Sequence, residues 1–291
     1  ILHAPQRASC HGRNQYVLDF SRKEVVDCIY DMMYKILSES KISYIKWDMN
    51  RSITECYSVA LPADRQGEVF HRYILGVYNL YDRLTTAFPQ ILFESCASGG
   101  GRFDPGMLYY APQGWISDDT DAAERVRIQY GTSMCYPISS MGSHVSVVPN
   151  HQLNRITSLH TRANVAYFGT FGYELDLNKL TDEEIAEVKA QIVFMKEYRE
   201  LIQFGNFYRL KSPFDGNETV WMTVSEDKRK ALVFWYRERN VVNAEFTRVR
   251  LQGLDPDLIY KNEYNGTENY GDELMNLGLL TTDVTAGEPT N

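Results

Sequence analysis

Two carboxylates and a glycine-rich run stand directly after apolar segments of the sequence. Asp48 follows the strand-like residues 42–47, Asp118 follows residues 115–117, and three glycines follow residues 91–95 and the tripeptide after them. In repeated strand-helix units, catalytic groups lie at the carboxyl ends of strands, where loops vary without disturbing the core. The sequence therefore predicts that these three strand ends contribute to one catalytic site.

Two aspartates on separate strand ends are what a retaining glycosidase requires. One carboxylate attacks the anomeric carbon and the other protonates the leaving oxygen, with about 5–5.5 Å between the two carboxyl groups. Lys46 lies two residues before Asp48, on the same strand face, and is expected to favour the ionised form of a nucleophile. The acidic neighbours of Asp118 are expected to raise its pKa toward the value of a catalytic acid.

Other interpretations of these segments are weaker. The glycine run at 99–101 lacks the GxxxxGK[ST] spacing of a phosphate loop. A nucleophilic Cys96 would need a histidine base that no motif supplies, so the simpler interpretation of Cys96 is a small buried residue. The acidic cluster after Trp115 lacks the full pattern of a calcium loop. Asp121, together with Asp119, suits a helix N-terminus, which leaves Asp118 to face a substrate.

Alternating strand and helix patterns predict an α/β architecture that positions these residues. A capping box of Ser21 with Glu24 and another of Thr181 with Glu184 mark two helix starts. Beyond Gly205 no helical pattern intervenes between strand-like segments, which predicts an antiparallel β domain and two domains, 1–204 and 205–291. The expected strands are 16–20, 42–47, 91–95, 115–117, 144–148, 165–168, 219–224, 231–236 and 246–251, and the expected helices are 21–37, 68–88, 121–134 and 181–204.

Composition excludes several other classes of function. The 291 residues are 44% apolar, which is typical of a globular protein with a sizeable core, and the net charge of −8 argues against nucleic acid or an anionic membrane as a partner. The sequence has no apolar stretch of about 18 residues. The five cysteines form no CxxC pair, so a reducing cytoplasm is expected rather than disulfides or a structural zinc site.

The same motifs resemble the α-galactosidases of glycoside hydrolase family 36. The resemblance lies in YIKWDMNR (44–51), FESCASGGGRFD (93–104) and WISDDTD (115–121), and it extends through residues 141–146 and 171–175. It implies a (β/α)₈ barrel followed by an antiparallel β-sandwich, and retaining hydrolysis of terminal α-D-galactosyl residues from melibiose- or raffinose-type oligosaccharides, with no metal and no organic cofactor. In the full-length form, a homo-oligomer is expected.

The resemblance also assigns roles residue by residue. Asp48 matches the nucleophile of the KWD motif, and Asp118 matches the acid/base of the SDxTD motif in preference to Asp119, because the second acid varies. Positions that line the galactose pocket are matched by Lys46, Arg13, Cys96 and Gly99, with Asn50 and Trp115 as second-tier candidates.

The chain departs from the family pattern at its ends. It begins Ile1-Leu2-His3 without Met, and by motif order it holds about strands 3–8 of the barrel, so an N-terminal sandwich and two barrel strands are expected to precede it. The C-terminal sandwich is expected to lack its last strand after residues 278–280. The alternatives are a non-catalytic carbohydrate-binding remnant and an α-galactosyl transglycosylase, because the missing strands would carry much of the discrimination between substrates.

Overall fold

The computed structural model describes residues 1–239, 242 and 247–281, and divides the chain into two compact units, Ile1–Asp118 and Asp119–Asn291. Each unit is described by itself. The predicted domain boundary at residue 205 is a different division, drawn from the change of pattern along the sequence, and stays a prediction.

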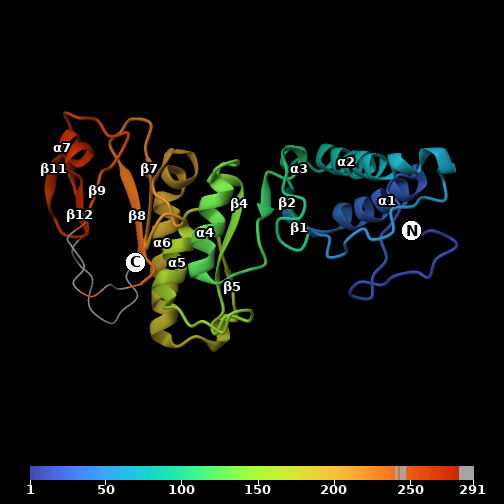
Figure 1. The fold of residues 1–291 in the computed structure, drawn as a ribbon, viewed down its shortest axis with the longest axis horizontal. Coiled ribbons are helices and arrows are strands. Elements are labelled where there is room, and N and C mark those ends of the chain that lie inside the picture. The colour runs from blue at the N-terminus through green and yellow to red at the C-terminus, as the bar shows by residue number, and fades with distance from the viewer. Residues whose placement is uncertain (240–241, 243–246, 282–291) are drawn as a thin grey trace. The chain divides into compact units, whose positions relative to one another are not determined.

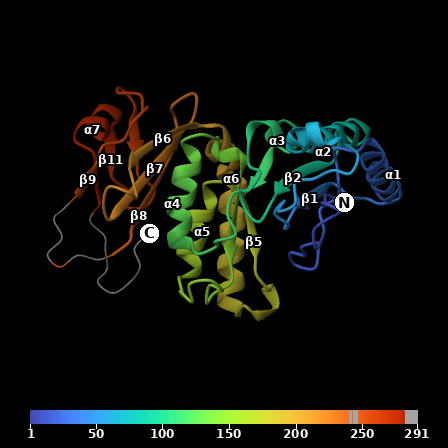
Figure 2. The ribbon, with the colours of Figure 1, turned by 45° about the vertical axis from the view of Figure 1, so that its right-hand side comes forward.

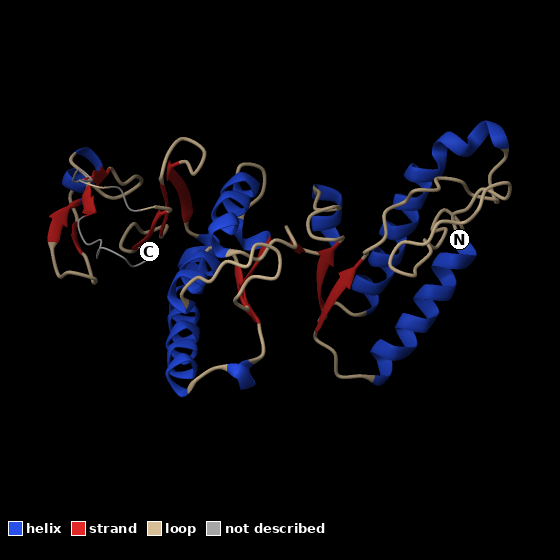
Figure 3. Ribbon diagram, turned by 60° about the horizontal axis from the view of Figure 1, so that its bottom comes forward, coloured by secondary structure: helices blue, strands red, loops and turns tan. Residues whose placement is uncertain are grey.

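The first unit is a parallel three-stranded sheet covered by helices. The sheet order is β1-β2-β3, and Figure 3 shows β1 and β2 running side by side in the same direction. Helices α1 and α2 lie next to each other (Figures 1 and 2). The elements are α1 (Lys23–Glu39), β1 (Tyr44–Asp48), a 3₁₀ helix (Ala63–Glu68), α2 (Val69–Ala87), β2 (Leu92–Cys96), α3 (Pro105–Tyr110) and β3 (Gln113–Trp115).

The two faces of β1 differ, which is what sets the orientation of the site. Ile45 and Trp47 are half-buried and pack on the helical layer, where the Trp47 ring contacts Tyr81 of α2 in a tilted arrangement with ring centroids 4.7 Å apart. The alternate residues Tyr44, Lys46 and Asp48 are exposed on the opposite face. Because successive strand residues point to opposite faces, packing of Trp47 fixes the direction in which Asp48 points.

Two predictions for the start of this unit are wrong. Residues 16–20 form no strand; the Val17 carbonyl accepts a hydrogen bond from the Leu2 amide instead of pairing with a sheet. The capping box of Ser21 is absent as well, since α1 has no side-chain cap. Both the hydroxyl and the amide of Ser21 donate to the buried carboxylate of Asp19, at 2.5 and 3.1 Å, and this local acceptor engages the serine in place of the helix end.

The second unit begins with further strand-helix alternation. Strands β4 and β5 pair in parallel, and Figure 2 shows α4, α5 and α6 beside one another. The capping box of Thr181 with Glu184 is confirmed at the start of α6, and Gly205 follows its last residue. The elements are α4 (Ala122–Ser133), 3₁₀ (Ile138–Ser140), β4 (Met141–Ser146), α5 (Leu159–Tyr167), β5 (Thr170–Glu174), 3₁₀ (Leu177–Lys179) and α6 (Asp182–Phe204).

The predicted strand at 165–168 is wrong, because these residues end α5. Ser158 caps that helix by accepting from the Thr161 amide at 3.0 Å, and most of the helix is buried, including Val165 and Tyr167. A short apolar run does not distinguish a buried helix from a strand by periodicity alone. The parallel strand expected in this part of the chain is β5 (Thr170–Glu174), which follows α5.

The remainder of the second unit is antiparallel, as predicted. Three strands form the sheet β6-β7-β8, and the strands predicted at 219–224 and 231–236 are confirmed as β7 and β8. Of the strand predicted at 246–251, residues 247–249 form β9, residues 250–251 are not strand, and residue 246 lies outside the described residues. The elements are β6 (Asn206–Lys211), β7 (Glu218–Val224), β8 (Ala231–Arg237), β9 (Thr247–Val249), β10 (Ile259–Lys261), β11 (Glu268–Tyr270), α7 (Gly271–Asn276) and β12 (Leu279–Thr281). Within the described residues, no helix has both the length and the apolar character to cross a membrane.

Candidate active site

The carboxyl ends of β1 and β2 bring three of the predicted site residues together. Asp48 is paired in register with Cys96, and Lys46 with Glu94, so these four side chains share one face of the sheet. The Met49 amide extends the pairing by donating to the Cys96 carbonyl at 3.0 Å. The backbone immediately after Asp48 is therefore held by β2, which fixes the carboxylate at the sheet edge.

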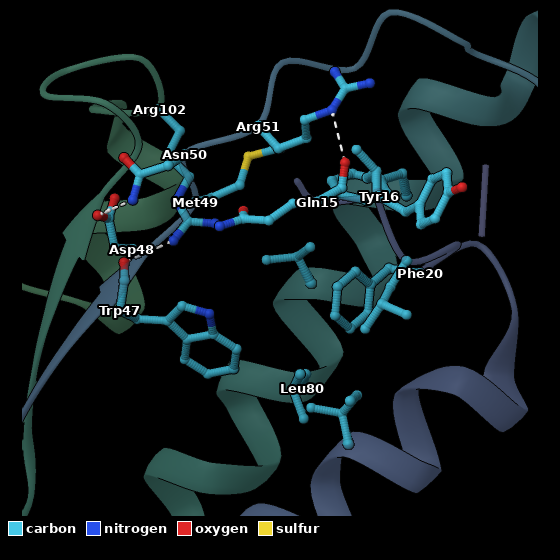
Figure 4. A pocket seen from close by; sticks show the side chains of 15 residues that line it. Gln15, Tyr16, Phe20, Trp47, Asp48, Met49, Asn50, Arg51, Leu80 and Arg102 are labelled. Carbon is cyan, nitrogen blue, oxygen red and sulfur yellow. Dashed lines mark hydrogen bonds between the residues drawn. The ribbon is translucent and has the colours of Figure 1, made fainter. Parts of the chain in front are cut away.

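Asp48 is surrounded by neutral hydrogen-bond donors. Partial desolvation disfavours the charged carboxylate, but hydrogen bonds from the Cys96 thiol, the Asn50 amide and the backbone amides of Met49 and Ser98 outweigh it, and the pKa of Asp48 lies below its ordinary value. Figure 4 shows Asn50 turned toward Asp48. A carboxylate with a lowered pKa is ionised at neutral pH, as a nucleophile must be.

Cys96 is a hydrogen-bond donor to Asp48. Burial, together with the neighbouring Asp48 carboxylate, raises the pKa of the Cys96 thiol to about 11. The thiol is therefore protonated at neutral pH, so it can donate to Asp48 and is a poor nucleophile itself. Cys96 is buried, as expected, and its thiol also contacts the Asp48 carboxylate.

The glycine run forms a tight loop against the segment that carries Asp118. Ser98 and Gly99 both have positive φ, 47° and 79°, and the Ala97 amide donates to the Gly99 carbonyl at 3.0 Å. A Cβ atom on Gly99 would lie 2.8 Å from the backbone nitrogen of Asp118 and 2.9 Å from Cα of Ser117. Only glycine allows this approach, so the run serves to bring two strand ends together rather than to bind phosphate.

Asp118 is exposed and accepts a hydrogen bond from the indole of Trp115, at 3.1 Å between Nε1 and Oδ1. The helix-start roles predicted for its neighbours are confirmed. Asp121 caps α4 by accepting from the amides of Ala123 and Glu124, and Asp119 accepts from the amide of Asp121 at 3.0 Å. These contacts engage Asp119 and Asp121 in the helix end, which is consistent with Asp118 as the carboxylate that faces a substrate.

Lys46 contacts a different carboxylate from the one expected. Its Nζ lies 3.4 Å from Oε1 of Glu94 and 4.5 Å from the centroid of the Trp115 ring. The low pKa of Asp48 has its main causes in the neutral donors described above rather than in Lys46. The remaining predicted residue, Arg13, lies in an exposed turn with φ of 52° and is not among the described residues joined by these contacts.

A cavity of about 300 Å³ opens beside Asp48 in the first unit. Figure 4 shows Asp48 and Asn50 on one side of it and Tyr16 and Phe20 on the other. The Arg102 guanidinium donates to the Trp47 carbonyl at 2.9 Å and so holds the backbone next to Asp48. No group of three or more His, Cys, Asp or Glu side chains in the described part of the chain is arranged to hold a metal ion.

The hydrogen bond from Cys96 gives a pH-dependence prediction. Replacing Cys96 with alanine removes a donor to ionised Asp48, so the pKa of Asp48 rises. Activity that requires ionised Asp48 is then lost at a higher pH on the acid side. We expect the acid limb of kcat/KM to move to higher pH and kcat/KM at the optimum to fall about fivefold, as for loss of one hydrogen bond.

Steady-state rates across pH measure both effects. The control is Cys28→Ala, which removes an exposed cysteine of α1 and is expected to leave both limbs in place. An acid limb that stays fixed in Cys96→Ala would contradict the role of the thiol.

Sequence reasoning missed two contributors to this site. Glu94 was treated only as part of a strand. A carboxylate in the middle of an apolar strand was a signal that its side chain faces polar neighbours, and the structure pairs it in register with Lys46. The Ser98 amide was missed because backbone donors depend on loop conformation, here the positive φ of Ser98.

The parallel strands, their covering helices and the carboxylates at the strand ends define an α/β protein of the barrel-enzyme class. Two family models match the chain. The Melibiase model matches residues 1–205, and the model described as Glycosyl hydrolase family 36 C-terminal domain matches residues 218–287. The chain belongs to the melibiase family, within glycoside hydrolase family 36.

Individual relatives agree with this assignment. The chain is 55% identical to Alpha-galactosidase AgaA of Geobacillus stearothermophilus and 52% identical to Alpha-galactosidase Mel36A of Lactobacillus acidophilus, covering 96% of this chain and 38% of each relative. The chain thus spans under two fifths of the length of these relatives. The crystal structure of AgaA matches with a TM-score of 0.95 and 54% identity over 98% of this chain and 40% of that one. Related AgaA structures hold raffinose and stachyose. The predicted fold class, a partial (β/α)₈ barrel followed by a β-sandwich, is confirmed.

Proposed function

We propose that the protein is a retaining glycosidase that removes terminal non-reducing α-D-galactosyl residues from oligosaccharides of the melibiose and raffinose type. The observation that carries this proposal is the strand-end Asp48, kept ionised by four neutral donors on the exposed face of the sheet. Family membership and the raffinose and stachyose complexes of AgaA support the substrate class. The transglycosylase alternative draws on no separate observation.

In the first step, Asp48 attacks the anomeric carbon while Asp118 gives its proton to the glycosidic oxygen. The bond from the anomeric carbon to that oxygen breaks, and a covalent galactosyl ester on Asp48 forms. In the second step, Asp118 takes a proton from water, whose oxygen attacks the anomeric carbon and displaces Asp48. Two inversions give net retention, and both aspartates return to their starting protonation states.

Each neighbour has a role in this sequence. Cys96 and Asn50 donate to Asp48 and hold its attacking oxygen in place. The Trp115 indole donates to Asp118 and orients it. Lys46, on the same sheet face as Asp48, has an ammonium positioned to bind a sugar hydroxyl.

The anomer released first by the full-length protein tests this proposal. With melibiose as the substrate, we expect NMR spectra recorded before mutarotation to contain α-galactose, because retention preserves the configuration. The matched control is an aryl β-galactoside, which should not be hydrolysed. Release of β-galactose would indicate inversion and exclude Asp48 as a nucleophile, whereas transfer to a second sugar without release of galactose would favour the transglycosylase.

A further inference from the structure

A polar row crosses the three strands of the first unit, one level below the carboxyl ends. Lys46 of β1 is paired with Glu94 of β2, and Glu94 is paired with Gln113 of β3. Glu94 lies at the centre of the row and its side chain is 2% exposed. A buried carboxylate is costly unless charge and hydrogen bonds compensate it, so its neighbours explain why it is tolerated.

Both oxygens of Glu94 are engaged. Oε1 faces the Lys46 ammonium at 3.4 Å, and Oε2 accepts from the Tyr44 hydroxyl and from Nε2 of Gln113, the latter at 3.2 Å. Burial and the hydrogen bond to Glu94 raise the pKa of Tyr44, so its hydroxyl stays protonated and remains a donor. The Tyr44 hydroxyl and the Gln113 side-chain amide thus hold Oε2 in place, and Oε1 faces Lys46.

The contacts continue from Lys46 to the proposed acid/base. The ammonium lies 4.5 Å from the centroid of the buried Trp115 ring, within the range of a cation–π interaction, and the same indole donates to Asp118. Glu94 therefore stands at the start of a chain of contacts that ends at a proposed catalytic carboxylate, without touching a substrate site itself.

We propose that Glu94 is a positioning residue of the hydrolysis described above: its carboxylate fixes the Lys46 ammonium against the Trp115 ring, and so orients the indole that donates to Asp118. This inference rests on the proposed function. Removal of the buried Glu94 charge is expected to affect both proposed catalytic carboxylates, because the Lys46 ammonium then lacks its ion-pair partner.

The charge balance of this face gives the direction of the effect. The titratable and charged groups on it are Tyr44, Lys46, Asp48, Glu94, Cys96 and Asp118. Neutralising Glu94 removes one negative charge and leaves the Lys46 ammonium uncompensated. Asp48, on the same strand face as Lys46, then ionises more readily, so the acid limb of the pH profile moves to lower pH.

The test is Glu94→Gln in the full-length protein, with kcat and KM for melibiose measured across pH. We expect kcat to fall about tenfold, the range of energetic coupling through packed side chains, KM to change less, and the acid limb to move to lower pH. The charge-retaining variant Glu94→Asp should keep the limbs near those of the wild type. Tyr44→Phe is the matched control, since it removes a neutral donor from the same carboxylate and leaves the charge, and hence the limbs, unchanged.

A double variant covers the case in which Glu94→Gln fails to fold. Lys46→Met with Glu94→Gln removes both members of the ion pair and leaves no uncompensated charge. If Glu94 acts through Lys46, adding Glu94→Gln to Lys46→Met lowers kcat far less than Glu94→Gln does in the wild type. Where the single variant does not fold, the double variant should have the kcat of Lys46→Met.

The outcomes separate this inference from the proposed function. A fixed acid limb in Glu94→Gln, or a further tenfold fall in the double variant relative to Lys46→Met, would overturn the role of Glu94 while the wild type still hydrolyses melibiose with retention. Absence of retaining hydrolysis in the wild type would overturn the proposed function itself, and this inference with it.

Discussion

Replacing Asp48 with alanine is expected to abolish hydrolysis of melibiose and of aryl α-galactosides by the full-length protein. The covalent step cannot occur without the carboxylate, so kcat/KM should fall on the order of 10⁴-fold or more, as when a catalytic nucleophile is removed. Circular dichroism and steady-state rates check the fold and the loss. Asp48 lies at an exposed strand end, so the variant is expected to fold.

Azide identifies the step that Asp48 performs. In Asp48→Ala, azide fits the space left by the carboxylate and attacks an activated aryl α-galactoside directly, with one inversion, so the product should be β-galactosyl azide. The matched control is Asp104→Ala, which removes a carboxylate from the same unit that caps α3 by accepting from the Met107 amide at 2.9 Å. It should cost about 1 kcal/mol of stability and retain turnover. Near-wild-type rates in Asp48→Ala would remove Asp48 from the mechanism.

Replacing Asp118 with alanine is expected to have the second-largest effect, and one that depends on the leaving group. Melibiose has a poorly acidic leaving group that needs a proton, so kcat/KM should fall about 10²–10⁴-fold, the usual contribution of general acid catalysis. An aryl α-galactoside with an acidic phenol needs little protonation, so formation of the galactosyl ester should be much less affected. Hydrolysis of the galactosyl ester on Asp48 then becomes slow, because no base activates water.

The product formed with azide distinguishes Asp118 from Asp48. In Asp118→Ala, azide should accelerate turnover of the aryl substrate by attacking the ester on Asp48, giving α-galactosyl azide with net retention. The comparison variant is Asp119→Ala, which alters the start of α4 and should give no acceleration by azide. If azide accelerates Asp119→Ala and leaves Asp118→Ala unchanged, the acid/base assignment moves to Asp119.

The corrections to the predicted fold share a physical cause. Residues 16–20 and 165–168 are both short apolar runs, and such a run is compatible with a strand, a buried helix or an irregular segment. The buried Asp19 draws Ser21 away from the end of α1, and Ser158 supplies the cap that makes residues 165–167 helical. In each case a side-chain hydrogen bond near the segment, which the apolar pattern does not reveal, determines the local structure.

The sequence predicted the candidate site more fully than it predicted the strands. Asp48 and Asp118 were identified from their place after apolar segments, and the division of roles among Asp118, Asp119 and Asp121 follows from helix-capping chemistry that is local along the chain. Lys46 was expected to keep Asp48 ionised, but the low pKa of Asp48 has its main causes in neutral hydrogen-bond donors. Lys46 is close in sequence, but Glu94 on the next strand is its ion-pair partner.

The α/β order of elements, the change to antiparallel strands after Gly205 and the residue types at the strand ends can all be predicted from the amino-acid sequence. These properties depend on periodicity and on neighbours within a few positions. Only the tertiary structure decided which donors meet Asp48, why glycine is required at position 99, and that Glu94 holds Lys46 against Trp115. The register of β1, β2 and β3 places these side chains together, and register is a relation between strands that neither strand encodes alone.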